Sequence, residues 1–589
     1  MLREPKSLPR RILPLAVGVC LAAAGITVRA ATPPAWTAEL PETAKWHQVM
    51  VSTGSLVVGG AGSLSSIDPQ TGRVQWTRAD IKKTAPWNAR EIVGTPYLLI
   101  DNNEGMVMAD TSLQAVNLVD GKTAWATTPF RGYSLGTFPV PQKNLAVVFS
   151  NSYIDGKGSG VFATAYQLTD GKLLWQTLYR SSVLQHPSDT SGRFAIRLDL
   201  SGHQEPIVDG DTMYVPFGGM TALDLATGAI RWDVEFKSAH ASKKRAYAAP
   251  QISGDTIFAG GQGVILALDR NTGAVKWKSE KIFSGIIAQM LVTDDTVYAR
   301  LGGNFKEGPE WKLDKPFGVV ALDRATGAPR WTYTGAKDGI TNLMYDKASN
   351  TVVLCDATNL IAIDNASTGK VREAFKLPLE FKRKLGGADA AAAVIKGLGG
   401  FMTGGLGGSV RGLGGLSSAS RLDPPVALTW QGEGTIVARG QQHLLSFDVA
   451  KRSTNWSVEY PAPGYSGFAI VAMAVATTYL QTASAYGSAI NGESSWSATN
   501  KVEGTWGGLD AVVQRRFSAT RAVEDYTYVL TNVEDTGDKG VGLMAIDMKT
   551  GEPARQILIK DKEPDYEIDR IDGRLYVFDG KALRAWTLN

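Results

Sequence analysis

The stretch Ala222-Leu223-Asp224-Leu225-Ala226-Thr227-Gly228-Ala229-Ile230-Arg231-Trp232 decides the fold, because close copies of it recur along the chain. Residues 267–277 and 321–331 repeat the same order of alanine, leucine, aspartate, threonine, glycine and tryptophan. In all three copies the Asp precedes the Gly by four positions and the Trp by eight. A pattern with fixed spacing indicates a repeat architecture, in which each copy belongs to one supersecondary unit.

Looser copies extend the repeat over nearly the whole chain. Some replace the Asp, the Gly or the Trp, and the copy at Asp364 has one extra residue and no Trp. The motif residues of the nine copies are Asp68, Gly72 and Trp76; Asn117, Gly121 and Trp125; Gln167, Gly171 and Trp175; Asp224, Gly228 and Trp232; Asp269, Gly273 and Trp277; Asp323, Gly327 and Trp331; Asp364 and Gly369; Asp448 and Trp456; and Asp547 and Gly551. A degenerate tenth copy is Asn491-Gly492 followed by Trp496.

Each copy predicts a strand, a tight turn and a second strand. An apolar segment such as residues 265–268 favours a strand, and in the following Asp-x-x-Thr-Gly turn an Asp or Thr oxygen can accept a backbone N–H bond. The glycine can adopt a positive φ there without a Cβ clash. We expect the Trp of the second strand to pack its large apolar face into the seam with a neighbouring unit.

Further strands precede most motifs, as in Asp255-Thr256-Ile257-Phe258, so each repeat predicts a small antiparallel meander. One meander cannot bury both of its faces, so neighbours must stack, and closing the stack into a ring protects its ends. Residues 34–38 carry a motif Trp without its preceding strands, while residues 574–578 and 583–586 supply strands without a motif. We therefore predict an all-β fold, a single closed β-propeller of four-stranded blades, with the N- and C-terminal strands sharing one blade.

The A-x-D-x-x-T-G-x-x-x-W pattern, which covers roughly Trp36 to Asn589, resembles the pyrroloquinoline-quinone-like (PQQ-like) repeat family. The resemblance implies PQQ-like blades, and the number of motifs predicts eight or more of them. It implies less about function, because the family includes quinone-dependent dehydrogenases, the propeller component of the outer-membrane β-barrel assembly machine and other binding proteins.

The first thirty residues differ from the rest. Basic residues from Arg3 to Arg11 precede an apolar run, residues 12–26, and Val28-Arg29-Ala30 then offers small residues for cleavage. This order predicts a secretory signal peptide at residues 1–30, with the propeller at 31–589. The expected location is the periplasm, with outer-membrane association as an extension of the family resemblance. The alternatives are an uncleaved membrane anchor and a lipoprotein modified at Cys20.

Charge and cysteine content narrow the function classes. Residues 1–30 hold five of the 61 basic and one of the 57 acidic residues, so the rest of the chain has no net charge. Binding to phosphate backbones needs clustered Lys and Arg, so a nucleic-acid partner is not expected. Cys355 is the one cysteine outside the signal peptide, which excludes an internal disulfide in the exported protein.

A Gly/Leu-rich insertion is predicted at about residues 376–425, outside any blade. One interpretation is a flexible surface insertion, because glycine makes ordering costly. The other is a contact element that orders on a partner or at a membrane surface, which would be the one route to membrane contact. Its candidate contact residues are Leu398, Phe401, Leu406, Leu413 and Leu416.

Three shorter segments are interpreted as loops. Residues 181–206 and 302–316 are polar insertions, and we expect such connections on the rims of a propeller, where partner surfaces usually form. Gly158-Ser159-Gly160 is interpreted as a turn between strands and not as part of a nucleophile elbow, because that elbow needs a strand-to-helix context.

The sequence contains no motif for catalysis, a cofactor or a metal. The family's dehydrogenases combine a vicinal cysteine pair with a calcium site of Glu, Asn and Asp and an Asp base, and we can assign none of these here. The repeat aspartates are interpreted as turn residues. The histidines (His47, His186, His203, His240 and His443) lack zinc-site spacing and are expected to be isolated surface or packing residues.

The sequence thus predicts a non-catalytic binding scaffold of the periplasm or cell envelope that holds a protein partner and takes part in envelope protein assembly. A PQQ- and calcium-dependent dehydrogenase and a propeller that binds an envelope polymer are the alternatives. The oligomeric state, the blade count and the binding face stay open.

Overall fold

The computed structural model describes residues 32–84, 88–104, 110–154, 156–181, 205–236, 248–260, 263–280, 282, 287–307, 310–337, 339–370, 375–379, 381, 425, 427–440, 443–460, 526–535, 538–559, 565–569 and 571–588. Within these ranges the regular elements are β-strands, apart from one short 3₁₀ turn, η1 (Pro141–Lys143). None of the described residues belongs to a helix long and apolar enough to cross a membrane. The signal peptide and the tenth motif copy lie outside the described residues.

The strands form antiparallel groups, which we number as units 1 to 10. Unit 1 joins the two ends of the chain, in the order β1 (Trp36–Glu39), β40 (Ala582–Thr587), β39 (Arg574–Asp579) and β38 (Asp565–Asp569). Units 2 to 5 contain, in order, β2 (Trp46–Val49), β3 (Leu56–Gly59), β4 (Leu64–Ile67) and β5 (Val74–Arg78); β6 (Ala89–Glu91), β7 (Tyr97–Glu104), β8 (Asp110–Asn117) and β9 (Thr123–Ala126); β10 (Phe130–Val140), β11 (Leu145–Ile154), β12 (Gly158–Gln167) and β13 (Leu173–Arg180); and β14 (Ile207–Asp209), β15 (Thr212–Val215), β16 (Gly219–Asp224) and β17 (Ile230–Glu235).

Units 6 to 10 complete the chain. They contain, in order, β18 (Gln251–Ser253), β19 (Thr256–Gly260), β20 (Ile265–Asp269) and β21 (Val275–Lys278); β22 (Ile287–Val292), β23 (Thr296–Glu307), β24 (Glu310–Asp323) and β25 (Pro329–Tyr333); β26 (Met344–Asp346), β27 (Thr351–Cys355), β28 (Asn359–Asp364) and β30 (Phe375–Pro378); β31 (Ala427–Gly432), β32 (Thr435–Arg439), β33 (His443–Asp448) and β34 (Ser453–Glu459); and β35 (Tyr526–Asp535), β36 (Asp538–Asp547) and β37 (Pro553–Leu558). Two pairings cross unit borders: β10 with β8, and the short β29 (Gly369–Lys370) with β25.

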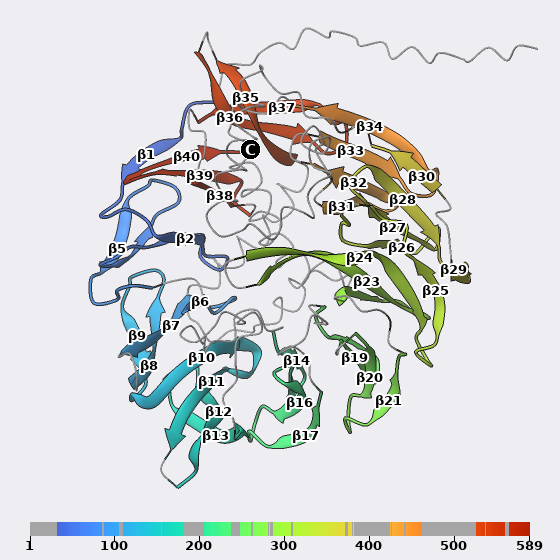
Figure 1. Ribbon diagram of the computed structural model, residues 1–589. Helices are drawn as coiled ribbons and strands as arrows, with labels where there is room; N and C mark the ends of the chain where they lie inside the picture. The colour runs from blue at the N-terminus through green and yellow to red at the C-terminus, as the bar shows by residue number, and fades with distance from the viewer. Residues whose placement is uncertain are drawn as a thin grey trace, which may run out of the picture.

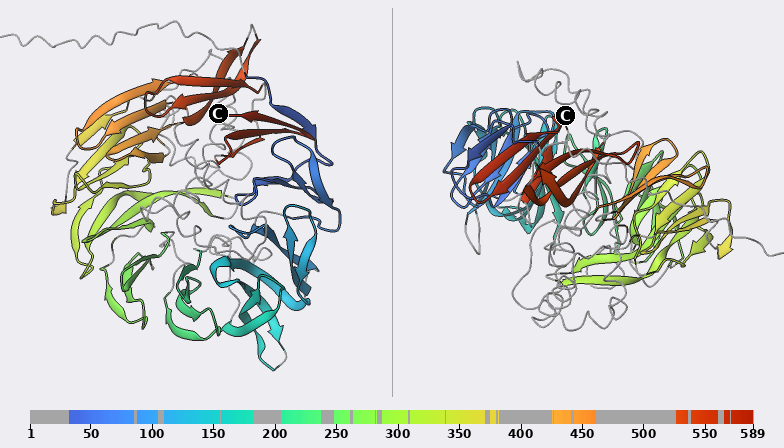
Figure 2. Two further views of the ribbon diagram at one scale, coloured as in Figure 1. Left: turned by 180° about the vertical axis from the view of Figure 1, so that it is seen from behind. Right: turned by 90° about the horizontal axis from the view of Figure 1, so that it is seen from above.

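The units follow one another around a ring (Figure 1). In units 2, 4, 5, 8 and 9 the first strand lies toward the middle and the last toward the outside, whereas in unit 1 β38 lies toward the middle and β1 toward the outside. The view from behind in Figure 2 shows blue β1 beside red β40, at the point where the chain ends meet. The four-residue register runs from Trp36 opposite Ala585 to Glu39 opposite Ala582. The terminal strands therefore share one sheet, as the sequence predicts.

The motif turns of units 2, 5, 6 and 7 share one geometry, which unit 6 illustrates. The Asp269 carboxylate accepts the backbone N–H groups of Asn271 and Thr272 and the Thr272 hydroxyl, each at 3.0 Å. Gly273 has a φ of +73° and donates its N–H to the Asp269 carbonyl at 2.8 Å. Bonding to the Asp side chain satisfies the turn backbone, and glycine supplies the left-handed residue at little steric cost.

The motif Trp of one unit packs on the motif Gly of the next. A Cβ added to Gly273 would lie 2.7 Å from the Trp232 ring, and the Trp232 indole N–H donates to the Arg270 carbonyl of the same turn at 3.0 Å. The same ring-on-glycine contact joins Trp36 to Gly72, Trp76 to Gly121, Trp125 to Gly171, Trp175 to Gly228, Trp277 to Gly327 and Trp456 to Gly551. Each Trp thus fixes both the distance and the register between neighbouring units.

Buried apolar side chains fill the seams between consecutive units. Phe149 and Trp175 of unit 4 pack against Phe217 of unit 5, and the aromatic rings of Phe149 and Phe217 lie 5.2 Å apart at 87°. The seam between units 9 and 10 has the smallest cluster among the described residues: Val437, Leu444, Val529 and Ile546. There the Met548 carbonyl accepts the Gln431 amide, and the Trp456 indole N–H is buried without a partner.

The predicted insertion begins too early, at residue 376. Residues 376–378 belong to β30, where Ala362 lies opposite Phe375 and Asn359 opposite Pro378. Phe375 takes the place of the missing motif Trp, since its ring lies 5.6 Å from that of Phe447 in the next unit. The insertion residues 382–424, including all five candidate contact residues, lie outside the described residues.

Two loop predictions are wrong. Residues 302–316 lie almost entirely in the β23–β24 hairpin, where Gly303 is opposite Asp314 and Glu307 opposite Glu310, because two extended segments of equal length can pair their backbones. Residues 158–160 begin β12, and the turn comes earlier, with the Lys157 N–H donating to the Ile154 carbonyl at 2.9 Å. Of residues 181–206, only 181, 205 and 206 are described.

The Gly273→Ala substitution should lower the free energy of unfolding because the new Cβ would meet the Trp232 ring and because φ is positive. Gly254→Ala is the matched control: its φ is +62°, but no atom lies within 4 Å of the added Cβ. Overpacking typically costs about 1–3 kcal/mol. In urea unfolding, Gly273→Ala should therefore lower the free energy of unfolding by that much more than Gly254→Ala does. Equal losses in the two variants would contradict the packing role of the glycine.

Candidate functional site

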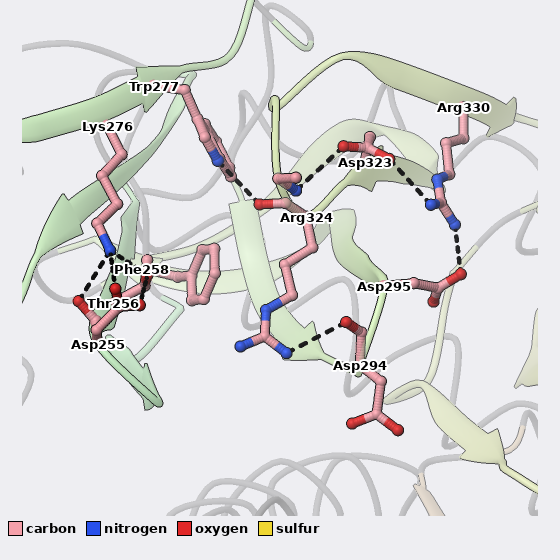
Figure 3. A pocket seen from close by; sticks show the side chains of 11 residues that line it. Asp255, Thr256, Phe258, Lys276, Trp277, Asp294, Asp295, Asp323, Arg324 and Arg330 are labelled. Atoms are coloured by element: carbon pink, nitrogen blue, oxygen red, sulfur yellow. Dashed lines mark hydrogen bonds and ion pairs between the residues drawn. The ribbon is translucent and has the colours of Figure 1, made fainter.

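A cavity of about 420 Å³ opens at the seam between units 6 and 7 (Figure 3). Its lining is mostly charged and comes from the turns and outer strands of both units: Asp255, Thr256, Phe258, Lys276 and Trp277 from unit 6, and Asp294, Asp295, Asp323, Arg324, Ala325 and Arg330 from unit 7. A concave surface with convergent polar groups is the natural place to look for a ligand or catalytic site.

In units 5, 6 and 7 a basic residue precedes the motif Trp and ties the outer strand to the turns of its own unit. Lys276 lies 2.8 Å from Asp255 and donates to the Thr256 hydroxyl at 3.0 Å. Arg330 lies 2.6 Å from Asp295 and 2.9 Å from Asp323, which is the motif Asp of unit 7. Figure 3 shows these two clusters on opposite sides of the cavity.

These pairings keep the acidic groups of the cavity ionised. The hydrogen bond from Arg330 lowers the pKa of Asp295 and the pKa of Asp323, and the hydrogen bond from Lys276 lowers the pKa of Asp255. A general acid or base works best with a pKa near the operating pH. The lowered pKa values of these three carboxylates suit ion pairing with Lys276 and Arg330 and do not suit proton transfer.

Arg324 is also occupied by the scaffold. Its guanidinium donates to the Thr293 carbonyl at 3.0 Å and to the Ser253 hydroxyl at 2.9 Å, so it links units 6 and 7. Unit 5 repeats the basic tie without this cavity: Arg231 donates to the Asp224 carboxylate and to the Thr212 hydroxyl, both at 2.6 Å. The cavity lining is thus a local version of a repeated structural device.

A second set of ties joins the innermost strands of neighbouring units. Gln251 donates its amide N–H to the Met290 carbonyl at 2.6 Å. Gln289 accepts the Leu343 N–H at 2.8 Å, and Asn342 accepts the Leu428 N–H at 2.8 Å. These side chains satisfy backbone groups on the next inner strand, so they hold units together around the middle of the ring.

Asp101 is a buried carboxylate between units 3 and 4. It lies on β7, is 5% exposed, and accepts hydrogen bonds from the Ser134 hydroxyl at 2.7 Å and the Thr137 hydroxyl at 2.9 Å, both on β10. Burial raises its pKa to about 6 and outweighs these two bonds. Its partners come from the scaffold, and the cavity between units 6 and 7 does not include it.

The expectation of isolated histidines is wrong for His47. Its imidazole meets the carboxylates of Asp565 and Glu567 from the other end of the chain, because β2 and β38 are neighbouring inner strands. Sequence spacing could not reveal this cluster, but the predicted pairing of the chain ends places β38 beside the start of the chain. His443 stacks on Phe381 with ring centroids 4.7 Å apart, and the other three histidines lie outside the described residues.

The described residues do not assemble a metal or quinone site. No three His, Cys, Asp or Glu side chains among them are arranged to hold a metal ion. Cys355 is fully buried in β27, and the sequence holds only one other cysteine, Cys20, so the vicinal pair of the dehydrogenases is missing. The residues that the structure describes therefore do not fit the PQQ and calcium site of those enzymes.

Replacing Asp101 with Asn should make stability less dependent on pH. Because the Asp101 pKa is raised, the contribution of Asp101 to the free energy of unfolding is fully present below pH 3.8. That contribution is lost as the pH rises through about 6. Asp101→Asn should therefore unfold at higher urea at pH 7 than wild type, by up to about 3 kcal/mol, and match it near pH 4. Asp346→Asn is the control, since buried Asp346 accepts the Ser349 backbone N–H at 2.8 Å; a gain of the same size there would contradict the assignment.

Two solved structures are similar to this chain at low sequence identity. BamB from Moraxella catarrhalis is 15% identical, with 74% of this chain and all of that chain covered and a TM-score of 0.35. A quinohemoprotein alcohol dehydrogenase from Pseudomonas putida HK5 is 10% identical, with 94% of this chain and 76% of that chain covered and a TM-score of 0.32. Among curated proteins no match is found.

A family model identifies the repeat family to which the chain belongs. A PQQ-like repeat family model, described as outer membrane protein assembly factor BamB, matches residues 27–197 and 185–333, which together make up just over half of the chain. The chain therefore belongs to this PQQ-like repeat family.

Proposed function

We propose that this chain is a non-catalytic, protein-binding scaffold of the bacterial cell envelope, built as one closed propeller of ten blades. The ring is supported by a continuous circuit of packing: each consecutive pair of units shares a buried apolar cluster, and Leu575 and Trp586 of unit 1 pack against Leu543 of unit 10. The pairing of β1 with β40 supplies the seal between the chain ends.

The observation that carries the binding role is the unequal length of the central hairpins. In units 1, 2, 5, 6, 8 and 9 the two middle strands have four to six residues each. In units 3, 4, 7 and 10 they have eight to fourteen, in the hairpins β7–β8, β11–β12, β23–β24 and β35–β36. We call these four the long hairpins.

The long hairpins leave the ring on the side opposite the motif turns. A central hairpin joins the second and third strands of a unit, whereas the Asp-x-x-Thr-Gly turn joins the third and fourth, so the two lie at opposite ends of the third strand. The added strand lengths of the long hairpins have no counterpart in the other six units. In Figure 1 the β23–β24 hairpin reaches over the middle of the ring.

Extended hairpins offer a partner protein both side chains and strand edges. The polar residues of the repeat and of the cavity already bond to one another, which favours a binding role over chemistry. The family model is that of an outer membrane protein assembly factor, so a protein partner in envelope assembly fits this chain. The signal-like order of residues 1–30 supports a periplasmic location.

The β23–β24 hairpin provides a direct test. Replacing residues 303–314 with an Asn-Gly turn should leave the folded ring intact and reduce recovery of an envelope protein with the tagged chain at least several-fold. Lys122→Ala on the motif-turn side is the control, and it should retain full recovery. An absorbance scan and a calcium assay on the same wild-type sample complete the experiment, and a stoichiometric quinone with calcium and no protein partner would contradict the scaffold function.

A further inference from the structure

The imidazole of His47 joins the first inner strand of the chain to the last. Its Nδ1 lies 2.7 Å from a Glu567 oxygen and its Nε2 lies 2.9 Å from an Asp565 oxygen, across more than 500 sequence positions. The ring also stacks on Phe578 of β39, with centroids 3.8 Å apart at 13°. The side chains of His47 and Glu567 are 14% and 23% exposed, whereas that of Asp565 is 63% exposed, so water screens the contact with Glu567 less than the contact with Asp565.

This geometry requires a protonated ring. A neutral imidazole has one N–H donor, but both ring nitrogens of His47 face carboxylate oxygens, so only the imidazolium can donate to both. Glu567 is held in place because its second oxygen accepts the Val49 N–H at 2.7 Å. The charged groups that act on the ring are Asp565 and Glu567 from β38, while Phe578 presents an uncharged face.

The tie between units 2 and 3 uses a carboxylate, since Glu91 of β6 accepts the backbone N–H groups of Val51 and Ser52, and ties at three further seams use amides. Gln251, Gln289 and Asn342 bridge neighbouring inner strands with uncharged amides, whose bonds do not depend on pH. Among the inner-strand ties described here, the one between β2 and β38 is the one made by a titratable cation. It also lies at the point where the ring depends on non-covalent contacts between the chain ends.

We infer that His47, Asp565 and Glu567 form a charge latch that makes closure of the ring depend on protonation. While His47 carries its proton, the latch reinforces the β1–β40 pairing and the packing between units 1 and 2. Loss of that proton removes one of the two hydrogen bonds and the attraction to both carboxylates. The chain-end seam then loosens.

The sign of the pH effect follows from the direction of the shift. Burial alone lowers the His47 pKa, but the hydrogen bonds that the ring donates to Asp565 and Glu567 outweigh burial and raise the pKa to about 9 from an ordinary 6.5. The stabilisation is therefore fully present below pH 6.5 and is lost as the pH rises through about 9.

His47→Gln is the test variant, because glutamine keeps a polar side chain and cannot carry the charge. The ratio of its unfolding constant to that of wild type should fall at least about tenfold between pH 6.5 and 9.5, since only wild type loses the latch in that window. The matched control is His443→Gln, another buried histidine stacked on a phenylalanine, but one that lies in unit 9 with its Nε2 3.7 Å from a Glu459 oxygen, away from the chain ends. Its ratio to wild type should not follow the same pH course.

A second readout locates the effect. At constant pH 7, amide hydrogen exchange should speed up in β1, β2 and β38–β40 of His47→Gln and stay unchanged there in His443→Gln. Asp565→Asn leaves the bond between Glu567 and Val49 in place. In this variant the stability should be lost at a lower pH midpoint than in wild type. A pH-independent ratio for His47→Gln, or faster exchange spread evenly over all units, would overturn the latch.

Discussion

The contact between a tryptophan ring and the glycine of the next turn is the constraint on which the rest of the structure depends. It works in two ways at once: the ring lies where any Cβ would stand, and its N–H bonds to a carbonyl of the same turn, as for Trp175 with Gly228 and Leu225. A flat apolar face and one directed donor fix the distance and the orientation of two units together. The contact recurs at seven seams, those from unit 1 through to unit 7 and the one between units 9 and 10, and at each of them it makes a unit depend on its neighbour.

The same constraint explains how the polar residues of the repeat are used. The motif Asp holds its turn, the basic residue before the Trp holds the turns to the outer strand, and inner-strand amides hold neighbouring units together. These side chains are occupied in holding the units together. Binding surfaces for partners must therefore come from segments that are not part of the repeat. The long hairpins are such additions, because the shorter central strands of units 2, 5 and 6 pack equally well without them.

Much of the fold could be predicted from the sequence because its determinants are local. The Asp, Gly and Trp of one turn lie within eight positions, and the unmatched strands at the two ends indicate a shared sheet. The failures have physical reasons. Phe375 replaces the Trp outside the fixed spacing, the β23–β24 hairpin contains the polar residues expected of a loop, and His47 meets Asp565 and Glu567 only after the ring has formed. The cavity between units 6 and 7 likewise joins residues of two repeats, so no single motif marks it.

The central claim is that partners bind the side of the ring from which the long hairpins extend. Amine cross-linking in native envelope extracts tests it directly, because both sides carry lysines. Lys157, Lys306, Lys312 and Lys539 lie at the ends of the long hairpins, while Lys122, Lys172, Lys451 and Lys549 lie in motif turns. The account predicts that cross-links to a partner concentrate on the first set. Partner cross-links concentrated on the motif-turn lysines would contradict it.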